Sequence, residues 1–193
     1  MKAYKGYERN EGRDFETLPK GAYVIKILGA KEEVNKRGDG SYIRMAFDIA
    51  EGEYAGFYDK SYKADKREDK KWSNDAYIYL NCPKDNDEQF IIDNFNKFIT
   101  AVEDSNEGYH WNWDENTLKG KLVGAKFYIE QSEYNDKIYD HTKAKWFVAA
   151  QKVRDGKAGK LPNDKLLTQA PKPAGSSDFM SISDSIEEEV PWN

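Results

Sequence analysis

The chain has 193 residues, of which 34% are charged and 38% hydrophobic, and its mean hydropathy is −0.94. This length predicts one folded domain with appended segments. No apolar stretch approaches the ~20 residues of a membrane helix, and none follows the initial Met, so we expect a cytoplasmic protein. One cysteine and two histidines lead us to expect no internal disulfide, no metal site and no cofactor.

The charge is distributed unevenly along the chain. Residues 176–193 carry five acidic and no basic side chains, whereas residues 143–172 carry eight basic and two acidic ones. Residues 1–175 taken together are neutral. A basic stretch followed by an acidic tail suggests two sites of opposite sign, and a merely solubilising tail is the alternative.

The first half of the chain predicts strands. Residues 1–17 are an extension, and residues 22–34 are a β-branched, aromatic strand in which Gly29 marks a bulge. In residues 42–49, alternation places Ile43, Met45, Phe47 and Ile49 on a core face. Residues 56–63 are the candidate third strand, with Phe57 in the core, and residues 77–80 are a further short strand-like run.

The second half predicts one helix and two more strands. Apolar residues recur at three- and four-residue spacing over residues 85–104, which indicates an amphipathic helix. It would be capped by Asp85, Asn86 or Asp87. Residues 121–130 and 143–153 read as strands around a polar hairpin loop, with Phe127 and Trp146 on core faces and Phe147 on the opposite face.

This order predicts a mainly β fold: a five-stranded Greek-key barrel of the OB type, with the helix between strands 3 and 4. A small open sheet with one packed helix is the alternative. We place the OB-fold domain at residues 18–153 and a flexible Gly/Pro/Ser/Lys linker at residues 154–185. An acidic tip at residues 186–193 completes a tail that we expect to be disordered.

Enzyme motifs are scarce, and we predict no catalytic residues. The chain has no phosphate-binding loop and no nucleophile elbow. Asp48, Glu51 and Glu53 could hold a divalent metal in a nuclease, but no spaced acidic or histidine partner is evident, so a solvated turn is favoured.

Binding chemistry is better represented, because aromatic residues reach 14% of the chain and many alternate with basic ones. Bases of single-stranded nucleic acids stack on aromatic rings while cations follow the phosphates. In OB folds the binding surface is the face of strands 2 and 3 with two flanking loops. The candidate DNA-binding residues are Lys36, Arg37, Tyr42, Arg44, Tyr58, Lys60, Tyr62, Trp72, Lys126, Tyr128, Lys137 and Tyr139.

The carboxyl end has the pattern of a peptide ligand, in which acids steer toward a basic patch and an aromatic anchor fills a pocket. The candidate partner-binding residues are Glu187, Glu188, Glu189, Val190, Pro191 and Trp192. This end resembles the carboxyl-terminal tip of bacterial and phage single-stranded-DNA-binding proteins, although Trp192 stands where Phe is usual and Asn193 follows it. In that family, partner proteins bind this tip.

The body also resembles a phage and prophage family found beside recombination and replication genes. The similar stretches are LPKGAYVIKI (18–27), FDIAEGEY (47–54), SNEGY (105–109) and LKGKLVG (118–124). The resemblance implies an OB-like protein that coats single-stranded DNA in a bacterial host cell and recruits phage or host replication and recombination proteins. The alternative is an interaction adaptor that binds no DNA, such as a phage inhibitor or a recombinase-loading factor.

Overall fold

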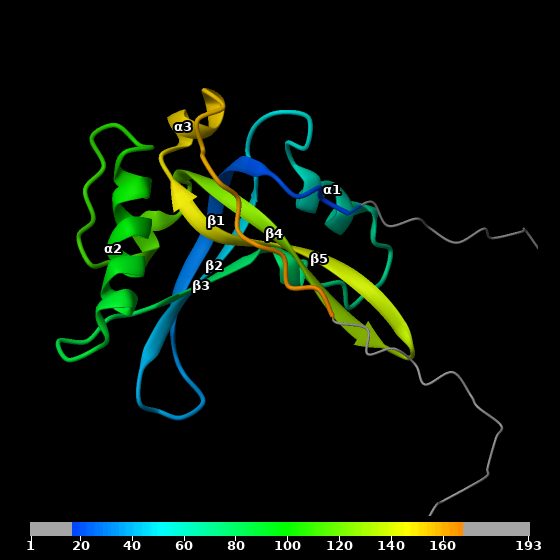
Figure 1. The fold of residues 1–193 in the computed structure, drawn as a ribbon, viewed down its shortest axis with the longest axis horizontal. Helices are drawn as coiled ribbons and strands as arrows, with labels where there is room; N and C mark the ends of the chain where they lie inside the picture. Colours follow the sequence, from blue (N-terminus) through cyan, green and yellow to red (C-terminus); the bar gives the residue numbers. More distant parts are fainter. Residues whose placement is uncertain (1–16, 168–193) are drawn as a thin grey trace, which may run out of the picture.

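A computed structural model describes residues 17–167, which contain one five-stranded antiparallel sheet and a few helices (Figure 1). The strands are β1 (Ala22–Val34), β2 (Ser41–Ile49), β3 (Tyr77–Asn81), β4 (Leu122–Tyr134) and β5 (Lys137–Val148), in the order β3-β2-β1-β4-β5. The α-helices of this part are α1 (Phe57–Ala64), α2 (Gln89–Glu103) and α3 (Ala150–Arg154). A mainly β fold with a helix between its third and fourth strands is therefore confirmed.

The first two strands form as their alternation predicts. Every second residue of β2 from Ile43 to Ile49 is buried, and Ile25 and Ile27 of β1 are fully buried beside them. The register of the β1–β2 pair shifts between Ile27 and Gly29, which confirms the expected bulge. These side chains form the centre of the core.

The predicted third strand is wrong, because residues 57–64 form α1. The helix starts after Gly56, which has no side chain to cap it. The carboxylate of Asp48, at the end of β2, instead accepts hydrogen bonds from the backbone N–H groups of Tyr58 (2.9 Å) and Asp59 (3.1 Å). A carboxylate at a helix amino terminus satisfies free N–H groups and favours the helix dipole. The true third strand is β3, the short strand-like run.

Helix α2 covers one end of the sheet. Its apolar stripe is buried at Phe95, Phe98, Ile99 and Val102, whereas Phe90 in the first turn is 59% exposed. The helix begins four residues later than predicted, and its N-cap residue makes no side-chain cap hydrogen bond. In Figure 1, α2 and α1 lie apart with strands of the sheet between them in this view, and both helices contribute side chains to one core cluster.

The β4–β5 hairpin is longer than the sequence indicates. Asn135 and Asp136 both have positive φ (50° and 57°), so they make the tight two-residue turn that matches the twist of paired strands. The register shifts between Lys126 and Phe127, which adds one residue to β5. This bulge reverses the predicted alternation: Trp146 is 43% exposed, although it was assigned to the core.

Phe147, expected on the outer face, turns inward as a result of the same bulge. Its ring packs edge-on against Phe98 of α2, with ring centroids 4.8 Å apart and an interplanar angle of 86°. An aromatic pair in this arrangement contributes about 0.5–1.5 kcal/mol beyond its buried area. The contact joins α2 to β5.

The folded part also continues beyond residue 153. After α3, the chain returns along β4, where Lys165 makes a parallel bridge to Glu130. The Asp164 carboxylate accepts a hydrogen bond from the Ile129 N–H (2.9 Å) and forms an ion pair with Lys20 (2.9 Å). Residues 154–167, expected in the linker, are therefore held by backbone and side-chain bonds. Within residues 17–167, no helix has the length and hydropathy to cross a membrane.

Candidate nucleic-acid interface

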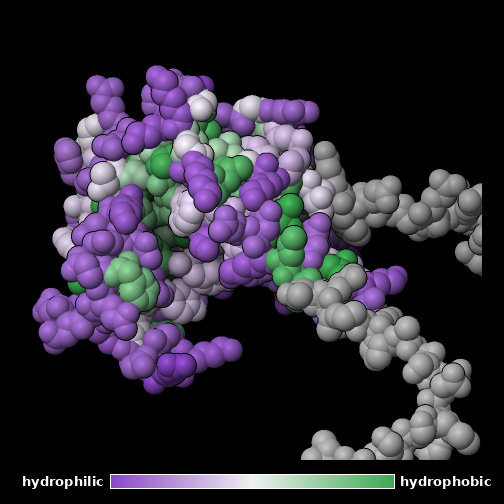
Figure 2. Space-filling view, in the orientation of Figure 1, coloured by the Kyte–Doolittle hydropathy of each residue, from purple (hydrophilic) through white to green (hydrophobic). Residues whose placement is uncertain are grey.

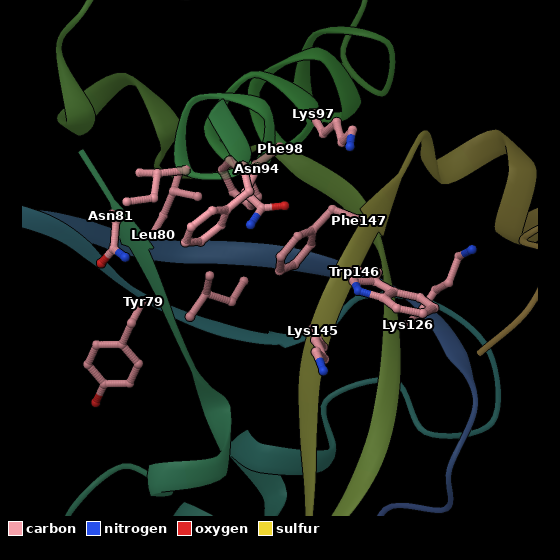
Figure 3. Close-up of a pocket in the computed structure, with 13 residues that line it drawn as sticks. Tyr79, Leu80, Asn81, Asn94, Lys97, Phe98, Lys126, Lys145, Trp146 and Phe147 are labelled. Carbon is pink, nitrogen blue, oxygen red and sulfur yellow. The ribbon is translucent and has the colours of Figure 1, made fainter. Parts of the chain in front are cut away.

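A groove of about 450 Å³ lies between β3 and β5, with α2 along one side (Figure 3). β3 and β5 are the two outer strands of the sheet order, so the groove lies where the sheet does not close on itself. Its apolar floor comes from side chains of the core, while its rim is polar. Figure 2 shows apolar surface between α2 and the sheet on an otherwise mainly hydrophilic face. The lining residues include Ile78, Leu80, Asn81, Ile91, Asn94 and Phe98.

The groove carries positive charge. Lys97 of α2, Lys126 of β4 and Lys145 of β5 line it, and no Asp or Glu of the described residues does. The Lys126 ammonium lies 5.9 Å from the Trp146 ring centroid and 3.2 Å from the Lys160 carbonyl oxygen. The Lys145 ammonium lies 5.5 Å from the Tyr128 ring centroid. These cations are held by rings and a carbonyl, which leaves their charge uncompensated by any described carboxylate at the groove.

Three exposed rings accompany the lysines. Trp146 is 43% exposed, and Tyr79 and Phe90 are each 59% exposed. In Figure 3, Trp146 and Lys145 come from β5 on one side of the groove, and Tyr79 projects from β3 on the other. Exposed aromatic faces beside cations are the combination that single-stranded nucleic acids bind.

The outer face of β2 and β3 extends this surface. The Tyr79 ring lies 5.8 Å from that of Tyr42 and 6.4 Å from that of Tyr77. The Arg44 guanidinium lies 5.1 Å above the Tyr77 ring. These four side chains make an aromatic and basic row that meets the groove at Tyr79.

One acidic side chain, Glu33, partly neutralises the positive charge of this row. It lies 3.6 Å from Arg44 and accepts a hydrogen bond from the Tyr42 hydroxyl (3.0 Å). That hydrogen bond raises the pKa of Tyr42. The row therefore offers ring faces more than net positive charge.

Two predicted stacking residues are wrong because their rings are buried. Tyr58 belongs to α1, is 4% exposed and packs edge-on against Phe47 at 5.7 Å. Burial raises its pKa strongly, as expected for a hydroxyl removed from water. Tyr128 is 6% exposed, and its hydroxyl is directed toward Glu130. Tyr58 belongs to the core cluster, so its ring cannot receive a base without repacking of the core. The Lys145 and Lys165 ammonium groups lie 5.5 and 5.4 Å from the Tyr128 ring centroid, so a base could reach that ring only by displacing such side chains.

Other predicted residues form a separate cluster near α1. The rings of Tyr62 and Trp72 lie 5.8 Å apart, and the Lys70 ammonium lies 4.6 Å above Tyr62. Trp72 is partly buried against the core, and Lys60 is exposed on the helix. None of these residues lines the groove between β3 and β5.

The two predicted loops are exposed but lie apart from the groove lining. Lys36 and Arg37 sit in the β1–β2 turn, where the Asn35 side chain accepts a hydrogen bond from the Arg37 N–H (3.1 Å). Lys137 and Tyr139 lie on the exposed β4–β5 hairpin. Of the twelve predicted residues, Lys126 alone lines the groove. The tip residues 187–192 lie outside the described part of the chain.

Lys97, Lys145 and Trp146 were missed as site residues for different reasons. Lys97 was missed because it lies on an amphipathic helix that was interpreted only as packing on the core. Trp146 was missed because the β5 bulge, which turns it outward, was not predicted. The basic and aromatic alternation around residue 145 was the available signal, but the sheet edges that bring these residues together are far apart in sequence.

The acidic residues considered for a metal site have structural contacts. Asp48 accepts hydrogen bonds from three backbone N–H groups, those of Ile49, Tyr58 and Asp59. Glu51 pairs with Arg154 (2.6 Å), which lowers the pKa of that carboxyl. Across residues 17–167, no group of three or more His, Cys, Asp or Glu side chains is placed to hold a metal ion.

Comparison with models of known protein families and with curated proteins finds no match to this sequence.

Proposed function

We propose that the chain binds single-stranded DNA without catalysis, in the groove between β3 and β5 and along the outer face of β2 and β3. The observation that carries the proposal is the grouping of Lys97, Lys126 and Lys145 with the exposed ring of Trp146 around one groove. Stacking on exposed rings contributes ~1–3 kcal/mol per base, and the lysines would contact phosphates.

The strand order supports an OB-type barrel. In such a barrel the faces of strands 2 and 3 bind oligonucleotides, flanked by the loop after strand 1 and the loop between strands 4 and 5. Here those elements are β2, β3, the turn with Lys36 and Arg37, and the hairpin with Lys137 and Tyr139. The aromatic row with Tyr42 and Tyr79 occupies the corresponding face.

The neutral charge of residues 1–175 favours single strands over duplex DNA as the ligand. A sequence-blind duplex binder relies on a broadly basic surface, whereas this chain concentrates cations at one groove. Base faces are open to stacking only in unpaired strands. Phage replication or recombination as the setting, and recruitment of replication proteins by residues 187–192, belong to the same proposal and rest on the sequence resemblance.

The test is titration with oligo-dT and with duplex DNA at several salt concentrations, followed by tryptophan fluorescence. We expect oligo-dT to quench the fluorescence and to bind more tightly than duplex DNA. The slope of log binding constant against log salt concentration should fall in magnitude by about 2 when Lys97, Lys126 and Lys145 are all changed to Gln, because each single-strand phosphate contact contributes ~0.7 to it. A matched triple variant of exposed lysines (Lys66, Lys119 and Lys157 to Gln) should keep the slope.

Absence of binding at low salt would refute DNA binding altogether. An equal effect of the two triple variants would refute the groove as the site. If the protein did not bind DNA but did bind a replication protein, the adaptor function would replace this proposal.

A further inference from the structure

A second pocket, of opposite charge to the groove, includes Phe95 of α2 in its lining. Its volume is about 250 Å³, and no residue lines both cavities. It is built by β1, β2, the segment after β3, one residue of α2 and the loop before the 3-10 helix at Glu115–Leu118. The lining residues are Glu32, Ser41, Ile43, Cys82, Pro83, Lys84, Phe95, Trp111, Trp113 and Glu115.

Three aromatic rings form one wall of this pocket. The Trp113 ring stacks on Phe95, with centroids 6.0 Å apart and an interplanar angle of 11°. Trp111 lies 6.4 Å from Phe95 and 6.3 Å from Trp113. Trp113 is 77% exposed, and its backbone has a positive φ of 66°, which is uncommon for a bulky residue. The fold thus holds a large flat ring at the surface in an unfavourable backbone conformation.

Two carboxylates face the same space. Glu32 accepts a hydrogen bond from the Ser41 hydroxyl, and Glu115 has no hydrogen-bond or ion-pair partner among residues 17–167. Burial, together with the negative charges of Glu32 and Glu115, raises the pKa of the Cys82 thiol. The two carboxylates therefore disfavour the thiolate form of Cys82, and this thiol stays protonated and unreactive.

The single cation of the lining does not neutralise these acids within the pocket. The Lys84 ammonium donates to the Asp39 carbonyl oxygen in the β1–β2 turn. An open ring face beside an unpaired carboxylate suits one chemical group above others. A guanidinium is planar, stacks on aromatic rings and donates paired hydrogen bonds to a carboxylate.

We propose that this pocket binds an arginine side chain of a partner polypeptide, with the guanidinium stacked on Trp113 and bonded to Glu115. A phosphate-bearing ligand is disfavoured by the two acids. The site is therefore independent of the DNA-binding groove, and the two can be tested separately.

The probe is N-acetyl-arginine amide, and its matched control is N-acetyl-citrulline amide, which has the same shape without the charge. Binding is followed by NMR of the tryptophan indole N–H signals, with Trp113 assigned from a Trp113→Phe variant. We expect millimolar binding that shifts the Trp113 signal and leaves Trp146 unchanged. The citrulline compound should bind at least about tenfold more weakly, because the charge-assisted bonds are lost.

Two variants locate the site. Glu115→Gln should weaken arginine binding by about tenfold, whereas Glu107→Gln, at an exposed position outside the pocket, should leave it unchanged. Equal binding of the arginine and citrulline compounds, or equal affinity of Glu115→Gln and the unaltered protein, would overturn the proposal. N-acetyl-lysine amide binding as tightly as the arginine compound would overturn the guanidinium assignment. A Trp113 shift that depends on protein concentration alone would identify a second copy of this chain as the occupant instead.

Discussion

The imidazole Nδ1 of His141 lies 3.1 Å from a carboxylate oxygen of Asp75, although 66 residues separate them. Asp75 lies in the 3-10 helix Asn74–Ala76, which leads directly into β3, and His141 lies in β5, so this contact ties together the two outer strands of the sheet order. The other ring nitrogen of His141 lies 2.8 Å from the Ser132 hydroxyl. The strands are thus joined at one end, and the basic groove opens farther along, at residues 78–81 and 145–147.

Loss of this contact should loosen the β3 edge. We expect Asp75→Ala to lower the free energy of unfolding by about 1 kcal/mol, the usual contribution of one hydrogen bond, and to speed amide hydrogen exchange in Tyr77–Asn81. Asp69→Ala, at an exposed position outside this contact, is the control and should leave exchange unchanged. Unchanged exchange in Asp75→Ala would show that the strands are held by packing alone.

Trp146 should contribute to DNA affinity without contributing greatly to stability. Because its ring is 43% exposed at the groove, Trp146→Leu should unfold at nearly the same urea concentration as the unaltered protein. We expect its oligo-dT affinity to fall about fivefold to 150-fold, the equivalent of ~1–3 kcal/mol for one stacked base.

Trp113→Leu is the matched control for that measurement. It also removes an exposed tryptophan, but one that belongs to the acidic pocket. It should leave oligo-dT affinity intact and abolish the arginine response. Parallel losses of DNA affinity in both variants would contradict the separation of the two sites.

Gly124 should tolerate no side chain. A Cβ at this position would lie 2.7 Å from a Val153 methyl group and 2.9 Å from the Val148 carbonyl oxygen, because the chain entering α3 passes directly over β4. We expect Gly124→Ala to lower the free energy of unfolding by about 1–3 kcal/mol through overpacking. Gly29→Ala is the control, since a Cβ there meets nothing within 4 Å, and its effect in urea denaturation should be small.

Glu130 should make stability depend on acidity. Hydrogen bonds from Lys143 and Lys165 lower the pKa of its carboxyl from the ordinary 4.5 to about 2. The folded state therefore binds this proton less tightly than the unfolded state, and the resulting stability is present above about pH 4.5 and lost as the pH falls toward 2. Glu130→Gln should flatten the pH dependence of unfolding in this window, whereas Glu133→Gln, exposed on the same strand, should not.

The sequence predicted the elements whose determinants are local. The alternation of Ile43 to Ile49 required only a strand with one buried face, and the spacing of Phe95, Phe98 and Val102 required only a helix on a core. Helix α1 was misread because the carboxylate that starts it, Asp48, lies nine residues before Phe57 and acts through space. The aromatic content of residues 57–62 favoured a strand in isolation.

The site was harder to predict than the fold. The groove joins Lys97, Lys126 and Lys145 only because β3 and β5 end up as neighbouring edges. Stacking residues chosen from the sequence included Tyr58, whose ring is buried in the core, and Tyr128, whose ring is buried near the Lys145 and Lys165 side chains. A tyrosine beside a lysine has the same sequence pattern whether its ring faces water or the interior.

The bulge at Lys145 decides which aromatic side chain of β5 meets solvent. Because strand side chains alternate, regular pairing of the same residues without the bulge would turn Trp146 inward and Phe147 outward. Deleting Lys145 would instead remove the unpaired residue and leave Trp146 outward and Phe147 inward. Which ring lies beside the groove therefore depends on how the strand pair accommodates its extra residue, and the identity of the aromatic residues alone does not reveal it.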